Sequence, residues 1–216
     1  MVGMTSRADR KARTRAAILR AARDRFVSQG YGGATIRDVA EAAGVGVGTV
    51  HAHFVDKAGL LRACFDDQIA EAVQLGFATL DSTAPLLDQL THLARVLFAA
   101  YARHPALSRE MFKQSLFPDA PDPHLGPFIA TLAELFRTAR EDGVLSRLPG
   151  NGVLAGHGWF AAYLISLIGG LAGAFGEPGS SASVAAQSAS FRQLMAVQLV
   201  GLGACPSLLL QPPETP

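Results

Sequence analysis

Cysteine is scarce in this sequence, and the two cysteines present are poorly placed for disulfide or metal chemistry. Among 216 residues only Cys64 and Cys205 occur, far apart and outside any Cys-x-x-Cys or Cys/His pattern. Disulfide frameworks and zinc sites need several such residues at short, regular spacings. We therefore expect no disulfide framework and no metal site, and we expect both thiols to be buried.

The sequence also lacks the short motifs that mark common enzyme sites. It contains no Gly-x-Ser-x-Gly, no His-Glu-x-x-His and no dinucleotide fingerprint. The glycine-rich stretch 44–48 is similar to a phosphate loop, but no Lys-Ser or Lys-Thr follows it and no strand pattern precedes it. The sequence therefore predicts a protein that is not an enzyme, with no catalytic residues and no cofactor.

Acidic residues are few near the N-terminus. Up to and including Lys57 there are ten Lys or Arg against five Asp or Glu, whereas the remainder has nine against thirteen. The first quarter thus carries a formal charge of +5 and the rest −4. Because neutralised phosphates supply most sequence-independent affinity for DNA, this asymmetry indicates a nucleic-acid partner at one end, although a solvated basic helix face gives the same count.

The basic N-terminus is not followed by a long apolar run. The stretch 16–26 is interrupted by Arg20, Arg23 and Arg25, whereas a secretory signal needs an uninterrupted apolar segment. We therefore expect a cytoplasmic protein.

Strand patterns are scarce, and apolar residues recur mostly at steps of three and four, so the predicted fold class is all-α. Glycine and proline breakers separate the segments. An irregular connector is expected at 118–127, a flexible joint at 177–183 and a disordered tail at 206–216. The expected helices cover residues 9–30, 36–43, 47–54, a segment starting near 57, 84–103, 105–116, 125–142, 153–175 and 183–202.

Two of these helices are short and are joined by a tight turn, as in a helix-turn-helix spanning Thr35 to Phe54. Ala40 supplies the small side chain needed where such helices cross, and Gly44 suits the positive φ of the turn. Val50 then points inward, and Val39, Val45 and Phe54 complete a small core. The spacing predicts a DNA-reading second helix braced by the first.

The string TIRDVAEAAGVGVGTVHAHFVDKAGLL (35–61), preceded by RAAILRAARDRFVSQGYGGA (15–34), resembles the N-terminal domain of the tetracycline-repressor-like (TetR) family. The resemblance implies an all-helical homodimer with a three-helix DNA-binding head, here 1–56, and a regulatory and dimerisation bundle, here 57–216. It also implies binding to double-stranded DNA at a pseudo-palindromic operator, and usually repression relieved by a small-molecule effector.

The resemblance assigns roles only where the motif aligns. It implies phosphate contacts from Thr35 and Lys57 at helix N-termini, and a base or phosphate contact from Arg37. Three positions depart from the family pattern, which usually has serine at Gly46, tyrosine at His51 and threonine at Ala34. The predicted DNA-binding residues are Thr35, Arg37, Val47, Gly48, Thr49, His51, His53 and Lys57.

The recognition segment 46–53 contains no Arg, Asn or Gln, the side chains that make the best bidentate base contacts. We therefore expect discrimination to come largely from contacts with thymine methyl groups and from DNA shape, with Arg37 as the strongest reader of guanine. Alternatively, His51 and His53 have only a structural role, in which they cap the short helix or pack against its neighbours. The arginines of 7–15 form either a DNA-tracking arm or a solvated tail.

A long segment without charge lies between Arg147 and Glu177, and its core at 153–175 is long enough to span a bilayer. His157 and several glycines and serines argue against insertion, so we expect no membrane partner. The resemblance implies that the last two helices form the dimer interface. Burial in that interface accounts for the apolar character of the segment 153–175. The predicted interface residues are Leu164, Ile168, Gly169, Gly173, Phe191, Leu194, Met195 and Gln198.

Aromatic residues are concentrated after residue 76, where they favour either an ordinary core or an effector pocket with an apolar lining. The predicted pocket residues are Phe98, Tyr101, His104, Phe112, Phe128, Trp159 and Tyr163. A nonspecific architectural DNA-binding protein remains the alternative function, because it keeps the basic head and needs no pocket.

Overall fold

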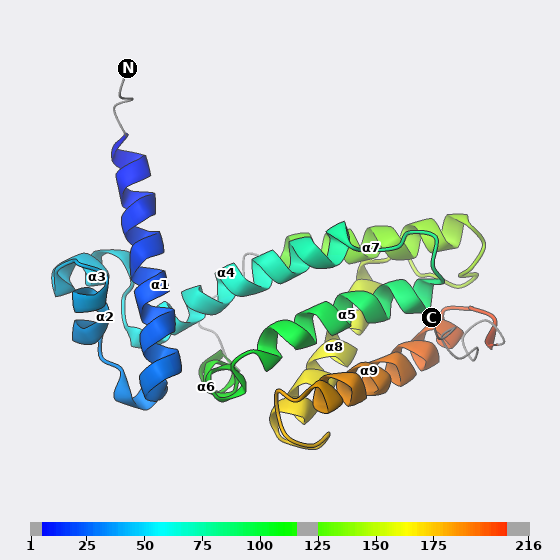
Figure 1. Cartoon of the computed structure of the whole chain (residues 1–216). Coiled ribbons are helices and arrows are strands. Elements are labelled where there is room, and N and C mark those ends of the chain that lie inside the picture. Colours follow the sequence, from blue (N-terminus) through cyan, green and yellow to red (C-terminus); the bar gives the residue numbers. More distant parts are fainter. Residues whose placement is uncertain (1–5, 116–124, 207–216) are drawn as a thin grey trace. The chain divides into compact units, whose positions relative to one another are not determined.

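The computed structural model describes residues 6–115 and 125–206, and every regular element in these ranges is a helix (Figure 1). The all-α prediction is therefore confirmed, and most helix ends lie within two residues of the expected positions. The helices are α1 Arg7–Gly33, α2 Ile36–Ala42, α3 Val47–His53, α4 Lys57–Ala78, α5 Leu86–Ala102, α6 Pro105–Ser115, α7 Leu125–Glu141, α8 Val153–Leu171 and α9 Ser181–Gly201.

The chain divides into two compact units. One lies within Met1–Glu71 and His104–Phe117 and contains α1, α2, α3, the start of α4, and α6. The other lies within Ala72–Arg103 and Pro118–Pro216 and contains α5, α7, α8, α9 and the end of α4. We call them the head unit and the body unit. A functional boundary between residues 56 and 57 stays a prediction, since this division reflects packing alone.

The head unit forms around a compact aliphatic core. Helix α1 packs against α2 and α6, and α2 packs against α3. Phe26 of α1 is 1% exposed, and Val39 and Val50 of the two short helices are fully buried. Helices of seven residues are unstable alone, so these buried contacts rather than helix propensity maintain α2 and α3.

The body unit is a bundle in which α5 packs along α9 and α8 lies between α7 and α9 (Figure 1). The Arg192 side chain of α9 forms an ion pair with Asp88 of α5. The indole Nε1 of Trp159 donates a hydrogen bond of 3.1 Å to the carbonyl oxygen of Leu90, which joins α8 to α5. These side chains fix the register of three helices around a shared core.

Three expected helix limits require correction. In α1, Gly30 interrupts the helix with φ 72° as expected, but one more turn follows to Gly33. Helix α8 ends at Leu171 instead of residue 175, because Gly173 adopts φ 84° and closes the helix. Helix α9 begins at Ser181, with Ser180 as N-cap, so residues 181–183 of the expected joint are helical.

Some expectations lie outside the described residues, namely residues 118–124 of the expected connector 118–127 and the tail over 207–216; residues 125–127 of that connector are helical, because α7 begins at Leu125. The thiol prediction is correct for Cys64, which is buried, and wrong for Cys205, which is exposed just after α9. Burial raises the pKa of the Cys64 thiol to about 12, and its Sγ lies 3.6 Å from the carbonyl oxygen of Leu19.

Candidate nucleic-acid interface

The start of α2 is closed by a reciprocal capping box between Thr35 and Asp38. The Thr35 hydroxyl accepts a hydrogen bond of 3.1 Å from the Asp38 amide, and the Thr35 amide donates one of 2.9 Å to the Asp38 carboxylate. The hydroxyl also donates to that carboxylate at 2.7 Å. The two hydrogen bonds from Thr35 lower the pKa of Asp38. Aspartate thus takes the position usually held by Glu or Gln in such a box.

The turn between α2 and α3 has the geometry expected from its glycine. Gly44 adopts φ 67°, and the amide of Val45 donates a hydrogen bond of 3.0 Å to the carbonyl oxygen of Ala40. Ala40 itself is 2% exposed. A Cβ at residue 44 would meet no neighbouring atom, so the left-handed backbone alone selects glycine at this position.

Helix α3 buries one face and exposes the other. Val50 is fully buried, and Phe54 just beyond the helix is 7% exposed. Thr49 and His53 are half-buried at the flanks. The solvent-exposed side chains form a surface with little polarity, made by Val47, Gly48, His51 and Ala52. We call this set the α3 surface.

Two cations flank the helix-turn-helix in different environments. Arg37, in the first turn of α2, is exposed. The Lys57 ammonium, at the start of α4, lies 4.4 Å from the centre of the Tyr31 ring and is held there by a cation–π contact. Sequence spacing gave no indication of this partner, because Tyr31 belongs to α1.

The two histidines make only weak contacts within the head unit. The His51 Nδ1 lies 3.4 Å from the carbonyl oxygen of Val55, and the His53 ring centre lies 6.2 Å from that of Phe54. His51 is exposed, so its ring is accessible to a ligand. His53 is half-buried and packs, which agrees with the alternative considered for it from sequence.

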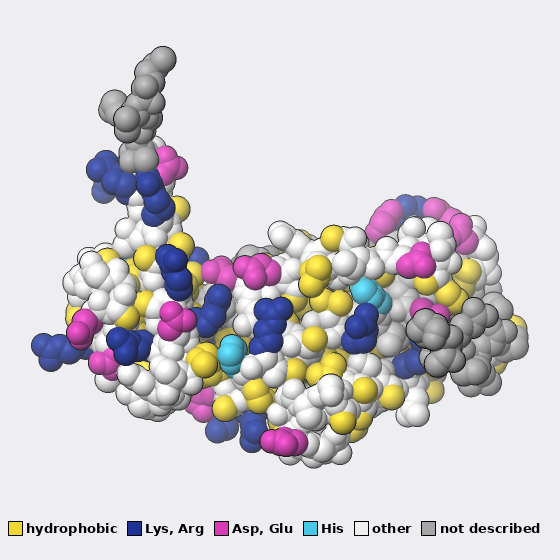
Figure 2. All heavy atoms as spheres, in the orientation of Figure 1, with side chains coloured by type: hydrophobic (Ala, Val, Ile, Leu, Met, Phe, Trp, Pro, Cys, Tyr) yellow, Lys and Arg dark blue, Asp and Glu magenta, His cyan; other side chains and the backbone are white. Residues whose placement is uncertain are grey.

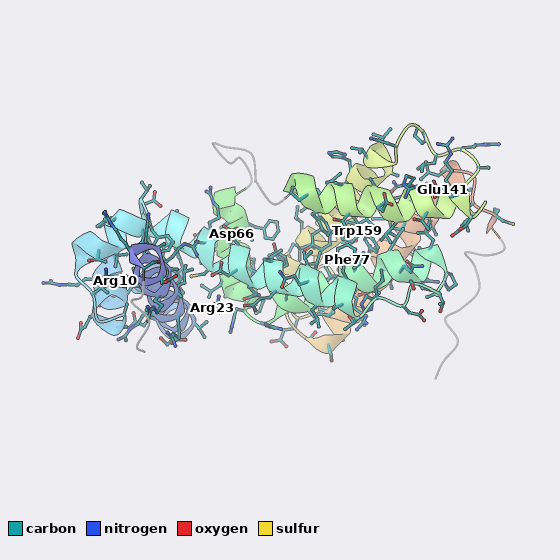
Figure 3. The ribbon with its side chains drawn as sticks, turned by 90° about the horizontal axis from the view of Figure 1, so that it is seen from above. Arg10, Arg23, Asp66, Phe77, Glu141 and Trp159 are labelled. Carbon is teal, nitrogen blue, oxygen red and sulfur yellow. The ribbon has the colours of Figure 1, made fainter. Side chains whose placement is uncertain are left out.

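In the body unit, Phe98, Phe128, Trp159 and Tyr163 of the predicted pocket residues lie together in the core. Figure 3 labels Trp159 and Phe77 in this region. The Tyr163 ring stacks on Trp159 at 5.4 Å and on Phe98 at 5.2 Å between centres. Burial raises the pKa of Tyr163 well above its ordinary value. The aromatic cluster consists of Phe77, Phe98, Phe128, Trp159, Tyr163 and Phe191, joined by ring contacts.

The remaining predicted pocket residues are placed differently. Tyr101 is buried on α5 in the body unit and forms a side-chain hydrogen bond with Tyr163 of the cluster. His104 and Phe112 fall within the head unit, because α6 packs against α1. Phe77 joins the cluster through Phe128, and the ring of Phe191, which was predicted for the dimer interface, packs on Trp159 at 5.4 Å.

The predicted dimer residues lie on different sides of α8 and α9. Phe191 and Met195 are fully buried within the body unit, so neither side chain lies on its surface. Gly169 lies against the Phe175 ring of its own chain, and Gly173 lies beyond the end of α8. The other predicted residues are the half-buried Leu164, the exposed Ile168 and Leu194, and Gln198, whose amide donates to the carbonyl oxygen of Ala155 at 3.1 Å.

Large apolar side chains on the same two helices are exposed, two of the predicted interface residues among them. Val197 of α9 is 75% exposed and Leu154 of α8 is 70% exposed, although both are large and apolar. The face, which we call the α8/α9 face, consists of Leu154, Ile165 and Ile168 of α8 and Leu194, Val197 and Val200 of α9. Within the described residues, α8 is the one helix long and apolar enough to cross a membrane, and 44% of its most apolar window is buried.

Comparison with known proteins identifies the fold of both units. Residues 18–64 match the family model described as bacterial regulatory proteins, tetR family. This match identifies the segment from the middle of α1 to the first part of α4 as a tetR-family domain. Members of the tetR family are transcription regulators, not enzymes. No curated protein sequence matches the chain.

Solved tetR-family structures share the fold over nearly the whole chain. FadR of Thermus thermophilus, a repressor in complex with lauroyl-CoA, is 24% identical with a TM-score of 0.68, covering 94% of this chain and 98% of its own. A regulator from Pectobacterium atrosepticum is 21% identical with a TM-score of 0.69, covering 91% and 97%. FadR of Bacillus subtilis, in complex with stearoyl-CoA, is 16% identical with a TM-score of 0.61, covering 83% and 96%.

Proposed function

We propose that this tetR-family protein is a cytoplasmic transcriptional repressor that binds a pseudo-palindromic operator as a homodimer and is released by a small, largely apolar effector. The observation that carries the proposal is the α3 surface, which is exposed on a helix that a capped α2, a glycine turn and a buried Val50 hold in place. A helix presented in this way fits the major groove of B-DNA.

The α3 surface favours an unusual mode of DNA reading. Val47 and Ala52 offer methyl groups to thymine, and His51 is the one polar side chain of the surface. Arg37 supplies the guanidinium for a guanine or a phosphate. The Thr35 hydroxyl already donates to Asp38, so a phosphate contact by Thr35 must compete with the cap. Much of the discrimination then rests on DNA shape.

Selection of bound duplexes from a random pool tests the DNA part of the proposal. We expect an inverted repeat with half-site centres about 34 Å apart, and an affinity that falls steeply with salt. Arg37→Ala should relax one symmetric base position and cost roughly 1 to 3 kcal/mol per half-site. A uniform loss reassigns Arg37 to phosphate, and equal affinity for unrelated duplexes identifies a nonspecific architectural protein instead.

The homodimer is supported by the α8/α9 face, because large apolar side chains gathered on one surface mark an interaction site. Two copies of this face form a self-complementary interface about a two-fold axis. Val197→Arg should convert the dimer into a monomer in analytical ultracentrifugation. Leu75→Arg, at an apolar position of α4 that is 51% exposed, is the matched control and should leave the dimer intact.

The effector is supported by the aromatic cluster, whose rings offer an apolar lining around Trp159. The rings are in contact with one another, so a ligand must separate them to enter. The acyl-CoA complexes of two FadR neighbours make a long acyl chain the first effector to test. Relief of repression is measured as transcription from a promoter carrying the selected repeat, with and without the effector.

The chain offers a built-in reporter for this effector, since Trp159 is its only tryptophan. Lauroyl-CoA and stearoyl-CoA should change the intensity or wavelength of Trp159 emission in a saturable way and lower the affinity for the operator. Free coenzyme A is the control and should do neither. Emission unchanged by both acyl-CoAs, with operator binding intact, would eliminate the acyl-chain effector.

A further inference from the structure

The N-terminal part of α1 extends beyond the core of the head unit. The first buried residue of α1 is Ile18, so about 11 residues, or about 16 Å at the rise of an α-helix, precede the core. We call residues 7–17 the α1 extension. Thr14 and Ala17 are its half-buried members, and the others are exposed. Ordinary packing therefore does not explain why this part of the helix is present.

The extension is nevertheless a capped helix. The Ser6 hydroxyl accepts a hydrogen bond of 3.1 Å from the Asp9 amide, and the Ser6 amide donates one of 2.9 Å to the Asp9 carboxylate. This reciprocal box satisfies two backbone donors at the helix start. Its cations are consequently held at helical spacing from Arg7 onward, two residues before the expected start of the helix.

The charge of the extension is concentrated and positive. Arg7, Arg10, Lys11 and Arg13 are exposed there against the single carboxylate of Asp9 (Figure 2). The next cation along α1 is Arg15, whose side chain contacts residues of the head unit. The Arg15 guanidinium lies 5.5 Å from the centre of the Phe54 ring and 3.8 Å from the Asp67 carboxylate. The cations of 7–13 are therefore the ones available to an external anion.

The helical period directs part of this charge toward the helix-turn-helix. Residues 7, 11, 14, 18 and 22 follow one another at steps of three or four, so they lie on one side of α1. Ile18 and Ala22 form a buried stripe on this side, and Arg7 and Lys11 continue it toward the N-terminus. That buried stripe packs in the head core, where α1 meets α2. In the view along α1, Arg10 lies on the side of the helix where α2 and α3 are found (Figure 3).

We propose that the α1 extension binds the phosphate backbone of duplex DNA beside the half-site read by α3, through Arg7, Arg10 and Lys11. Charge complementarity selects this occupant, because a duplex presents regularly spaced phosphates to a rigid row of cations. The contact adds affinity without reading bases. It rests on the proposed function, since α3 must first dock the head on DNA.

The test compares two duplexes and three proteins across a salt titration. One duplex ends at the outer edges of the selected inverted repeat, and the other adds about ten base pairs, one turn of B-DNA, on each side. The proteins are the wild type, the triple variant Arg7→Gln/Arg10→Gln/Lys11→Gln, and a control of equal charge, Arg95→Gln/Arg103→Gln/Arg147→Gln. The control positions are exposed and lie in the body unit.

We expect the wild type and the control to bind the longer duplex more tightly and with a steeper salt dependence. The triple variant should lose this difference, with a salt slope lower by about one for each phosphate contact removed. Glutamine favours helix, so circular dichroism should show the extension still folded. A second variant, Arg7→Lys/Arg10→Lys, keeps the charge and should retain the longer-duplex advantage.

Three results overturn the inference in distinguishable ways. Equal affinity of the wild type for both duplexes, with specific binding of the shorter one, removes the role of the extension and leaves the regulator intact. Failure of the wild type to bind either duplex overturns the proposed function and this inference together. Equal losses in the triple variant and the control assign the effect to net charge alone and also overturn the inference.

Discussion

The head and body units are both built from helices, but they bury and expose opposite kinds of residue. The head unit packs short helices on aliphatic side chains such as Val39 and Val50, and it presents cations and the α3 surface to solvent. The body unit encloses stacked aromatic rings and exposes the apolar α8/α9 face. The difference suggests a division of labour, with DNA contacts in one unit and contacts with a ligand and a second copy in the other.

The largest expected effect is a loss of stability that distinguishes the buried side of α9 from its exposed side. Phe191→Ala should destabilise the body unit by about 3 to 5 kcal/mol, because it leaves a cavity beside Trp159. Val197→Ala, on the exposed side of the same helix, should cost under about 0.5 kcal/mol in the monomer. Denaturant unfolding followed by Trp159 emission measures both. Comparable losses would show that the inner and outer sides of α9 are wrongly assigned.

A second substitution tests the backbone of the head unit. Gly44→Ala should destabilise the head by about 1 to 2 kcal/mol and weaken DNA binding, because alanine resists a φ of 67°. Gly48→Ala is the control for stability, since residue 48 lies inside α3 with open space around it and should gain helix propensity. Calorimetric unfolding of each variant supplies the measurement. If Gly44→Ala is neutral, the turn does not constrain the motif.

The capping box of α2 should make part of the head's stability depend on pH. The Thr35 hydrogen bonds lower the pKa of Asp38 in the folded state. The stabilisation is therefore complete above the ordinary carboxyl pKa and disappears as the pH falls through the lowered value, below about pH 4. Asp38→Asn should reduce this acid dependence, as measured by thermal unfolding between pH 2 and about pH 6. An unchanged acid profile in Asp38→Asn contradicts the assignment.

The smallest expected effect is a difference in reactivity between the two thiols, one in each unit. Cys205 is exposed and should react with a thiol reagent at once, whereas Cys64 is buried with its pKa raised to about 12 and should react only on unfolding. Stopped-flow labelling of the native protein should count one fast thiol. Cys205→Ser should remove the fast phase. Two fast thiols would mean that the region around α1 and α4 opens readily.

The same comparison explains which features could be predicted from the sequence. In the head unit, the identity of Thr35, Gly44 and Val50 follows from local requirements of a cap, a positive φ and an inward face, and the structure confirms all three. In the body unit, α8 and α9 are apolar on several sides, so periodicity alone could not separate the buried Phe191 from the exposed Val197. Periodicity could not assign His104 to a unit for a related reason, because His104 directly precedes α6, whose packing against α1 depends on contacts distant in sequence.

The central claim is that the α3 surface reads each half-site while the α8/α9 face sets the spacing between two copies. Parallel selection from one random duplex pool with the wild type and with Val197→Arg tests it most directly. The account predicts an inverted repeat of fixed spacing for the wild type, and for Val197→Arg either single half-sites or no enrichment. A fixed inverted repeat selected equally well by Val197→Arg, or no recurrent sequence for the wild type, would contradict it.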